Sequence, residues 1–262
     1  AINAGIAPKF SDPYSYGQGT NWQDEVFNNN APMMNHQVSV SGASEKVNYL
    51  FSLGFYTQDG IVGGNFDRSN YERLTLRSNT QYTLFDESKE RNWLNSLKVT
   101  SNLSYARIKS TNFDDNSTWG TPLGSALALS PILNVYDETE EAIKAQFDKY
   151  GTTAEYTPVY DPRNGKLFSI PGEFGEMSNP IAKLSLPGDK HWSHKFVANF
   201  SAELQLWDNL KFKTSYGADL SFWGYDGYRP LYYLRSGESS TQSSAYSRKE
   251  DGTVWQLENV LI

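Results

Sequence analysis

The chain has 262 residues and a net charge of −7, with 17 Tyr, 14 Phe, 7 Trp and no Cys. An acidic chain without a basic cluster argues against nucleic-acid binding, which depends on Lys and Arg neutralising phosphates. The absence of Cys excludes disulfides, thiolate catalysis and Cys-based zinc sites from this chain. No run of 18 apolar residues is present and no signal peptide opens the chain, so we expect no transmembrane helix and, for an exported protein, a mature or truncated form.

Residues 1–34 are predicted to be an irregular lead-in, because turn-forming residues dominate them. Within this stretch, residues 21–27 have the spacing of one amphipathic helical turn. We expect its apolar residues to pack before the first strand: Trp22, Val26 and Phe27.

Four segments that follow alternate apolar and polar side chains, the period of a strand whose two faces meet different environments. They span residues 35–42, 47–55, 73–84 and 97–106. The clearest alternation comes later, between residues 195 and 222. There, one set of alternate positions is apolar apart from Thr214: Phe196, Ala198, Phe200, Ala202, Leu204, Leu206, Leu210, Phe212, Tyr216, Ala218, Leu220 and Phe222. The residues between them are mostly polar, and Asp208-Asn209 predicts a tight hairpin turn.

A hairpin with one apolar and one polar face fits either a soluble sandwich or a transmembrane barrel. Length favours the barrel, since soluble strands usually have about 5–6 residues and membrane-crossing strands about 9–11. Aromatic residues at the strand ends fit a membrane-interface girdle: Trp192, Trp207, Phe222 and Trp223.

The whole pattern predicts an all-β, antiparallel up-and-down meander of about seven strands, with residues 254–262 as the last strand. Short and long connections alternate, as they do in outer-membrane barrels. The long loops are predicted at 57–69, 109–191 and 224–252, and the second of them is long enough to indicate a functional role. Within it we expect short helices at 123–129 and 138–149.

No constellation of residues nominates an enzyme, a metal site or a cofactor site. His191 and His194 are three apart on a strand and face opposite sides, and no carboxylate pair or phosphate loop stands out. Aromatic residues in the predicted loops are candidates for binding a substrate or partner, with burial inside folded loops as the alternative: Trp119, Trp223, Tyr225, Tyr228, Tyr232 and Tyr233.

Several segments resemble, in order, the SusC/RagA type of TonB-dependent transporter, a family of Bacteroidetes outer-membrane proteins. The early ones are NWQDEVF at 21–27, NHQVSVSG at 35–42 and QDGIV at 58–62. The later ones are LSPILNVYD at 129–137, SNPIA at 178–182 and WQLEN at 255–259. The resemblance covers nearly the whole chain, and the ordered combination is more specific than any single piece.

The resemblance implies a plugged barrel of about 22 strands in the cell outer membrane. It also implies energy from the TonB complex through parts of the parent protein outside this chain, a SusD-like surface lipoprotein as partner, contact with outer-membrane lipid, and import of oligosaccharides or peptides. On this basis residues 1–34 are the lead-in and 35–262 a partial barrel, which other segments are expected to complete because lipid does not tolerate open strand edges. The runner-up function is a cell-envelope β-protein that binds glycans or proteins through aromatic loops without transport.

Overall fold

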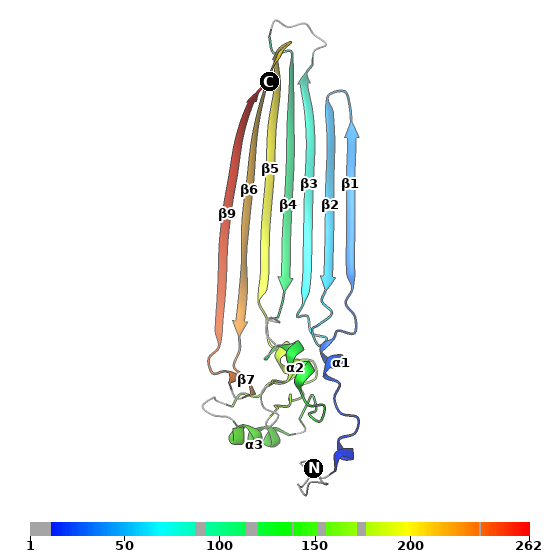
Figure 1. Ribbon diagram of the computed structural model, residues 1–262, viewed down its shortest axis with the longest axis vertical. Helices are drawn as coiled ribbons and strands as arrows, with labels where there is room; N and C mark the ends of the chain where they lie inside the picture. Colours follow the sequence, from blue (N-terminus) through cyan, green and yellow to red (C-terminus); the bar gives the residue numbers. More distant parts are fainter. Residues whose placement is uncertain are drawn as a thin grey trace, which may run out of the picture.

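A seven-stranded antiparallel sheet dominates the computed structural model (Figure 1). The structure describes residues 12–86, 93–113, 120–137, 139–150, 156–171, 177–235 and 237–262. The sheet order is β1-β2-β3-β4-β5-β6-β9, and every neighbouring pair is antiparallel. Its strands are β1 (Met33–Ala43), β2 (Val47–Asp59), β3 (Asn70–Phe85), β4 (Ser96–Thr111), β5 (Lys190–Trp207), β6 (Leu210–Arg229) and β9 (Ser244–Leu261). The predicted all-β meander is confirmed.

The remaining elements gather at one end of this sheet, as Figure 1 shows for α1, α2, α3 and β7. They are the 3-10 helix η2 (Pro13–Tyr16), α1 (Trp22–Val26), α2 (Pro122–Ala128), α3 (Glu140–Tyr150), α4 (Pro180–Ser185), and the two-stranded sheet of β7 (Tyr232–Arg235) and β8 (Glu238–Ser240). The helices predicted at 123–129 and 138–149 correspond to α2 and α3, although residue 138 lies outside the described part of the chain. None of the helices in the described ranges has the length and apolar character needed to cross a membrane.

The connections alternate in length, as predicted. Residues 44–46 and 208–209 make short turns at one end of the sheet, whereas 60–69, 112–189 and 230–243 connect strands at the other end. The third predicted short link joins β3 to β4, and its residues 87–92 lie outside the described ranges. All the long connections therefore lie at the same end of the sheet, together with the helices.

The strands extend further toward the long loops than the alternation indicated. The predicted loop 224–252 is wrong at both ends, because β6 continues to Arg229 and β9 begins at Ser244, with Tyr228 opposite Ala245. The predicted loops 57–69 and 109–191 are shortened by a few residues for the same reason, and β1 begins inside the predicted lead-in. Backbone pairing needs no apolar face, so the ladder continues where both faces carry polar or aromatic side chains and the period-2 signal disappears.

The hydrophobic core lies in the layer formed by the long connections and residues 12–32, called here the loop layer. Among the described residues, every buried hydrophobic side chain belongs to it and none to the seven-stranded sheet. The larger cluster comprises Trp22, Val26, Val62, Ala126, Leu129, Phe168, Met177, Ile181, Ala182, Leu184 and Leu234, and the smaller one Ile143, Leu167, Ile170 and Tyr233. A soluble sandwich would bury one face of its sheet, which is not the case here.

Helix α1 holds the lead-in against the loop layer. The indole Nε1 of Trp22 donates a hydrogen bond to the Ser130 carbonyl at 3.0 Å, and the Val26 carbonyl accepts from the backbone N–H groups of Gly63 and Gly64, each at 2.9 Å. Trp22 and Val26 are buried as expected, but Phe27 is 41% exposed, so its predicted packing is wrong. Phe27 has left the helix for an extended conformation, which turns its side chain away from the core.

Asn179 ties α4 to the rest of the loop layer. Its side-chain oxygen caps the helix by accepting from the N–H groups of Ile181 and Ala182 at 3.0 and 3.2 Å. Its amide nitrogen donates to the carbonyls of Val135 and Ser169 at 2.9 and 3.2 Å. The side chain is fully buried, so each of these polar groups depends on the others for hydrogen bonds.

We predict that Asn179→Ala destabilises the loop layer by about 2–4 kcal/mol, since it removes a helix cap and leaves buried carbonyls without donors. The measurement is hydrogen exchange of the loop-layer amides in the complete protein. The matched control is Asn21→Ala, because Asn21 occupies the cap position of α1 but makes no side-chain cap bond. Equal loss of protection in both variants would contradict the assigned role of Asn179.

Candidate functional site

The sheet has one apolar and one polar face, and the strand register defines both. Residues directly opposite each other point to the same side of a sheet. One row across six strands contains Val38, Leu53, Leu76, Tyr105, Phe196 and Leu220. The row beside it on the same face contains Val40, Phe51, Ser78, Leu103, Ala198 and Ala218.

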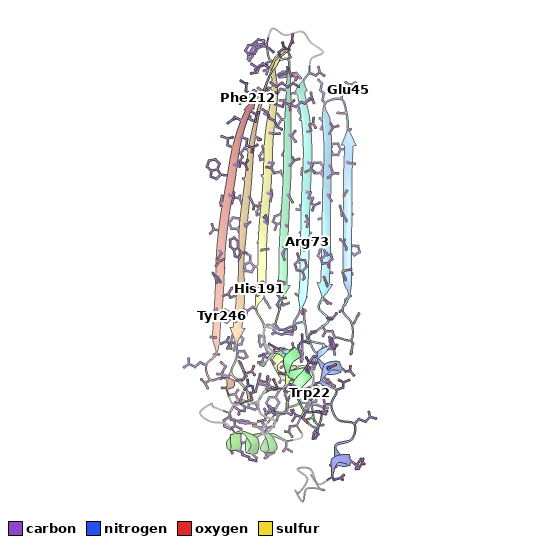
Figure 2. The ribbon with its side chains drawn as sticks, viewed as in Figure 1. Trp22, Glu45, Arg73, His191, Phe212 and Tyr246 are labelled. Carbon is purple, nitrogen blue, oxygen red and sulfur yellow. The ribbon has the colours of Figure 1, made fainter. Side chains whose placement is uncertain are left out.

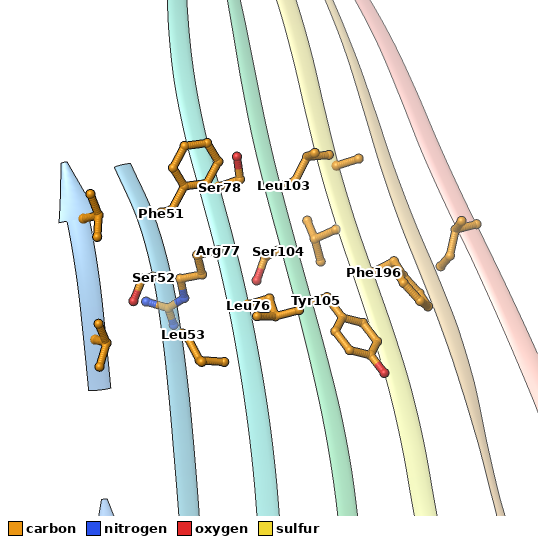
Figure 3. Close-up of a pocket in the computed structure, with 15 residues that line it drawn as sticks. Phe51, Ser52, Leu53, Leu76, Arg77, Ser78, Leu103, Ser104, Tyr105 and Phe196 are labelled. Carbon is orange, nitrogen blue, oxygen red and sulfur yellow. The ribbon is translucent and has the colours of Figure 1, made fainter. Parts of the chain in front are cut away.

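The apolar face contains a shallow depression of about 670 Å³ (Figure 3). Phe51, Leu53 and Leu76 line it and remain 50%, 46% and 44% exposed. Water would be an unfavourable contact for so continuous an apolar surface. Acyl chains of a bilayer would cover it without that penalty.

The height of the apolar band matches a bilayer. On β5 it runs from Phe196 to Leu204, a span of about 26 Å at 3.3 Å per residue, and the nine residues fit the length of a membrane-crossing strand. On the same face, toward the long loops, the next positions carry Arg107, Lys109 and Trp192. Charged and amphipathic side chains of this kind mark the level of lipid headgroups.

The opposite face is mostly polar, with a few apolar residues such as Val197 on β5 and Val254 on β9. On β5 it carries Lys195, Asn199, Ser201 and Glu203, and on β3 it carries Arg73, Arg77, Asn79 and Gln81. Lys195 forms an ion pair with Asp219 at 2.9 Å, and both side chains remain partly exposed. An exposed ion pair adds little stability, so this face is a hydrated surface, as expected for the inner wall of a barrel.

Two of the six aromatic candidates lie on the polar face of β6. Trp223 is opposite Ser193 and Tyr225 is opposite His191, so Trp223 belongs to the inner wall and its predicted place in a lipid-facing girdle is wrong. Trp192 and Phe222, from the same predicted girdle, do lie on the apolar face. The extension of β6 explains the difference, because it places successive residues on alternate faces above the apolar band.

The other candidates have different surroundings. Tyr228 and Tyr232 line one pocket, whereas Tyr233 is 2% exposed and packs in the smaller core cluster. Trp119 lies outside the described residues. For Tyr233 the alternative of burial inside folded loops therefore holds.

The pocket that contains Tyr228 and Tyr232, called here the junction pocket, lies where the loop layer meets the sheet. Its volume is about 530 Å³, within the usual range for a small-molecule site. Figure 2 shows two of its lining residues, His191 and Tyr246, at the loop-layer end of the sheet, far from Glu45 and Phe212 at the short-turn end. Among the described lining residues, the cations are Arg68, Lys183 and Arg229, and the one carboxylate is that of Asp189.

The tyrosine rings of the pocket continue onto the inner wall. Tyr246 donates a hydrogen bond from Oη to Asp189 Oδ1 at 2.6 Å. Its ring centroid is 6.1 Å from that of Tyr225, which in turn is 5.4 Å from the His191 ring. Burial raises the pKa of Tyr232, and the charge of Glu238 adds to the effect, so its phenol keeps its proton and can donate a hydrogen bond.

A buried carboxylate positions the loop at 60–69 beside this pocket. Burial alone would raise the pKa of Asp161, but hydrogen bonds from Arg163 and from the Tyr136 hydroxyl hold it at about 2. Arg163 in turn donates from Nη1 to the Gly64 carbonyl at 2.8 Å and lies 3.8 Å above the Phe66 ring. The charged pair therefore connects the long connection 112–189 to the loop that carries Arg68.

Sequence reasoning missed the charged residues of the pocket. Arg68 lies in the connection 60–69, Lys183 and Asp189 lie in the connection 112–189, and Arg229 ends β6, so no spacing rule links them. For the histidines, His194 Nδ1 lies 2.8 Å from Tyr105 Oη, a satisfied polar contact. Within the described ranges, no group of three His, Asp or Glu residues is placed to hold a metal ion.

Three curated proteins are similar to this chain over most of its length. They are the TonB-dependent receptor SusC of Bacteroides thetaiotaomicron (28% identity over 71% of this chain) and the TonB-dependent receptors P3 and P26 of Formosa agariphila (27% over 79% and 30% over 76%). The matched parts make up only 16%, 17% and 16% of those receptors. No family model matches the chain. None of the three names is that of an enzyme.

Solved structures agree on the fold. Two structures of the RagAB peptide importer, one described as the open-open state, superpose with a TM-score of 0.64 at 19% identity. Each match covers 94% of this chain and 23% of the other. The described sheet and loop layer therefore correspond to about a quarter of a much longer chain.

We predict that Phe200→Arg destabilises the inserted protein by about 2–4 kcal/mol, because it places a charge in the middle of the lipid-facing band. Ser201→Arg, one residue along but on the polar face, is expected to be tolerated far better. The test is the fraction of complete protein that folds into lipid vesicles, read as resistance to protease. Equal losses at both positions would contradict the assignment of the two faces.

Proposed function

We propose, from the premise that this chain is a barrel segment of the SusC/RagA type of TonB-dependent receptor, that the complete protein imports nutrients across the outer membrane. The segment lies in the outer membrane as part of the wall of a β-barrel. In this proposal residues 35–262 supply early wall strands and extracellular loops, and residues 1–34 lead into them.

The observation that carries the proposal is the position of the packed core. Among the described residues the sheet buries no hydrophobic side chain on either face, while the loop layer at one end is well packed. A wall between lipid and a hydrated lumen needs an apolar outer face and a polar inner face, with a rigid structure only at its mouth. A binding module that stays in water would not leave one face of seven strands apolar and uncovered.

The proposed cargo is an oligosaccharide or a peptide, as the family resemblance implies, and the structurally similar RagAB is a peptide importer by name. A SusD-like surface lipoprotein would cover the mouth beside the loop layer, and TonB would act through parts of the parent protein outside this chain. The segment itself would contribute part of the inner wall, and its aromatic loop residues would meet the cargo; of these, Tyr228 and Tyr232 line the junction pocket.

Deletion of the gene for the complete protein should abolish uptake of its cargo, measured with fluorescent oligosaccharides and peptides in energised cells. Restoring the gene with Tyr228→Ala should recover uptake only in part, several-fold below wild type, because a half-exposed ring in the pocket contributes about 0.5–1.5 kcal/mol to contact with a ligand.

The matched control is Tyr14→Ala, which changes the same residue type at a position that is 93% exposed. It should restore uptake fully, with equal amounts of both variants in the outer membrane. Undiminished uptake of every probe after gene deletion, with surface binding lost, would instead favour the alternative of an envelope protein that binds glycans or proteins without transport.

A further inference from the structure

The junction pocket contains more positive than negative charge. Lys183 pairs with Glu238 at 2.7 Å, so its charge is balanced. Asp189 accepts the hydrogen bond of Tyr246 and attracts Arg68. Among the described residues Arg229 makes no ion pair. Its positive charge acts to lower the pKa of both Tyr232 and Tyr246. Arg229 therefore contributes to the pocket a guanidinium that forms no ion pair with any described residue.

Arg68 is the second cation with unused donors. Its Nε is buried and has no hydrogen-bond partner among the described residues, a rare condition for a buried polar atom. The guanidinium lies so close to Gly188 that a Cβ at that position would overlap it. Burial lowers the pKa of Arg68, as expected for a cation partly removed from water. Arg68 thus adds a second positive charge to the lining of the pocket.

The rest of the lining suits a sugar. Tyr228, Tyr232 and Tyr246 line the pocket, and a tyrosine combines a ring face with a hydroxyl group, so it can stack on a sugar ring while bonding to its substituents. Arginine is the side chain best shaped for a carboxylate, which it binds through two parallel hydrogen bonds. His191, which lines the pocket, lies on the polar face of β5 beside Tyr225 of β6.

We propose that the junction pocket binds a carboxylate-bearing oligosaccharide, with Arg229 and Arg68 on the carboxylate and the tyrosines on the sugar ring. This assignment rests on the import function proposed above and names the class of its cargo. Neutral sugars of the same size lack the group that the two arginines require.

The test is calorimetric binding to the complete receptor purified in detergent, so it does not depend on uptake. The probes are trigalacturonic acid and its trimethyl ester, which keeps the shape and removes the charge, together with triglutamate as an acidic peptide. We expect the free acid to bind at least ten-fold more tightly than the ester and than triglutamate, and to lose affinity as salt is raised.

Arg229→Gln should weaken binding of the free acid at least ten-fold, and Arg229→Lys should recover part of that loss because the charge remains. The matched control is Arg77→Gln, the same change on the polar face of β3 away from the pocket, which should have no effect. Both variants must keep the protease resistance of the wild-type barrel.

Equal affinity for acid and ester, or an unchanged affinity in Arg229→Gln, would overturn the proposal. Preference for triglutamate over trigalacturonic acid would also overturn it and would indicate an acidic peptide as cargo. Neither result would affect the import function itself, which fails only if gene deletion leaves uptake intact.

Discussion

The structure depends on one constraint, which is that every backbone N–H and C=O group inside a bilayer must bond to another part of the protein. The strands meet it through an antiparallel ladder, in which β5, for example, pairs with both β4 and β6 over almost its full length. Because the ladder satisfies the backbone hydrogen bonds, the side chains of each face can match the solvent that this face contacts, lipid on one side and water on the other. Phe196, Phe200 and Leu204 face lipid, while Lys195, Asn199 and Ser201 face water.

The same constraint explains where the packed core lies. Inside the membrane the sheet needs no core, because lipid covers one face and water the other. Above the membrane the long connections must bury their own apolar residues, and they do so around Trp22, Ile181 and Leu184. Buried polar anchors, chiefly Asn179 and the Asp161–Arg163 pair, then fix the geometry of this layer. The junction pocket lies between the seven-stranded sheet and the loop layer, where the long connections meet the end of the strands.

The sequence predicted what depends on local periodicity. The two faces of β5 and β6, the Asp208-Asn209 turn, the sides of the long and short connections and the helices α2 and α3 all agree with the structure. The prediction failed where the ladder leaves the apolar band, at 224–229 and 244–252, because pairing there continues without alternation. Sequence reasoning also could not identify Arg68 and Arg229 as pocket residues. They lie 161 positions apart in the sequence, and only the folded structure places both in the lining of one pocket.

The most direct test of the two-faced wall is a cysteine scan along β5 in the complete protein, since this chain contributes no native Cys. Single Cys residues at positions 196–204 would be treated in intact cells with a water-soluble maleimide that is small enough to enter the lumen. The account predicts reactivity with a period of two, strong at Val197, Asn199, Ser201 and Glu203 and weak at Phe196, Ala198, Phe200, Ala202 and Leu204. Uniform reactivity along the strand, or the opposite alternation, would contradict it.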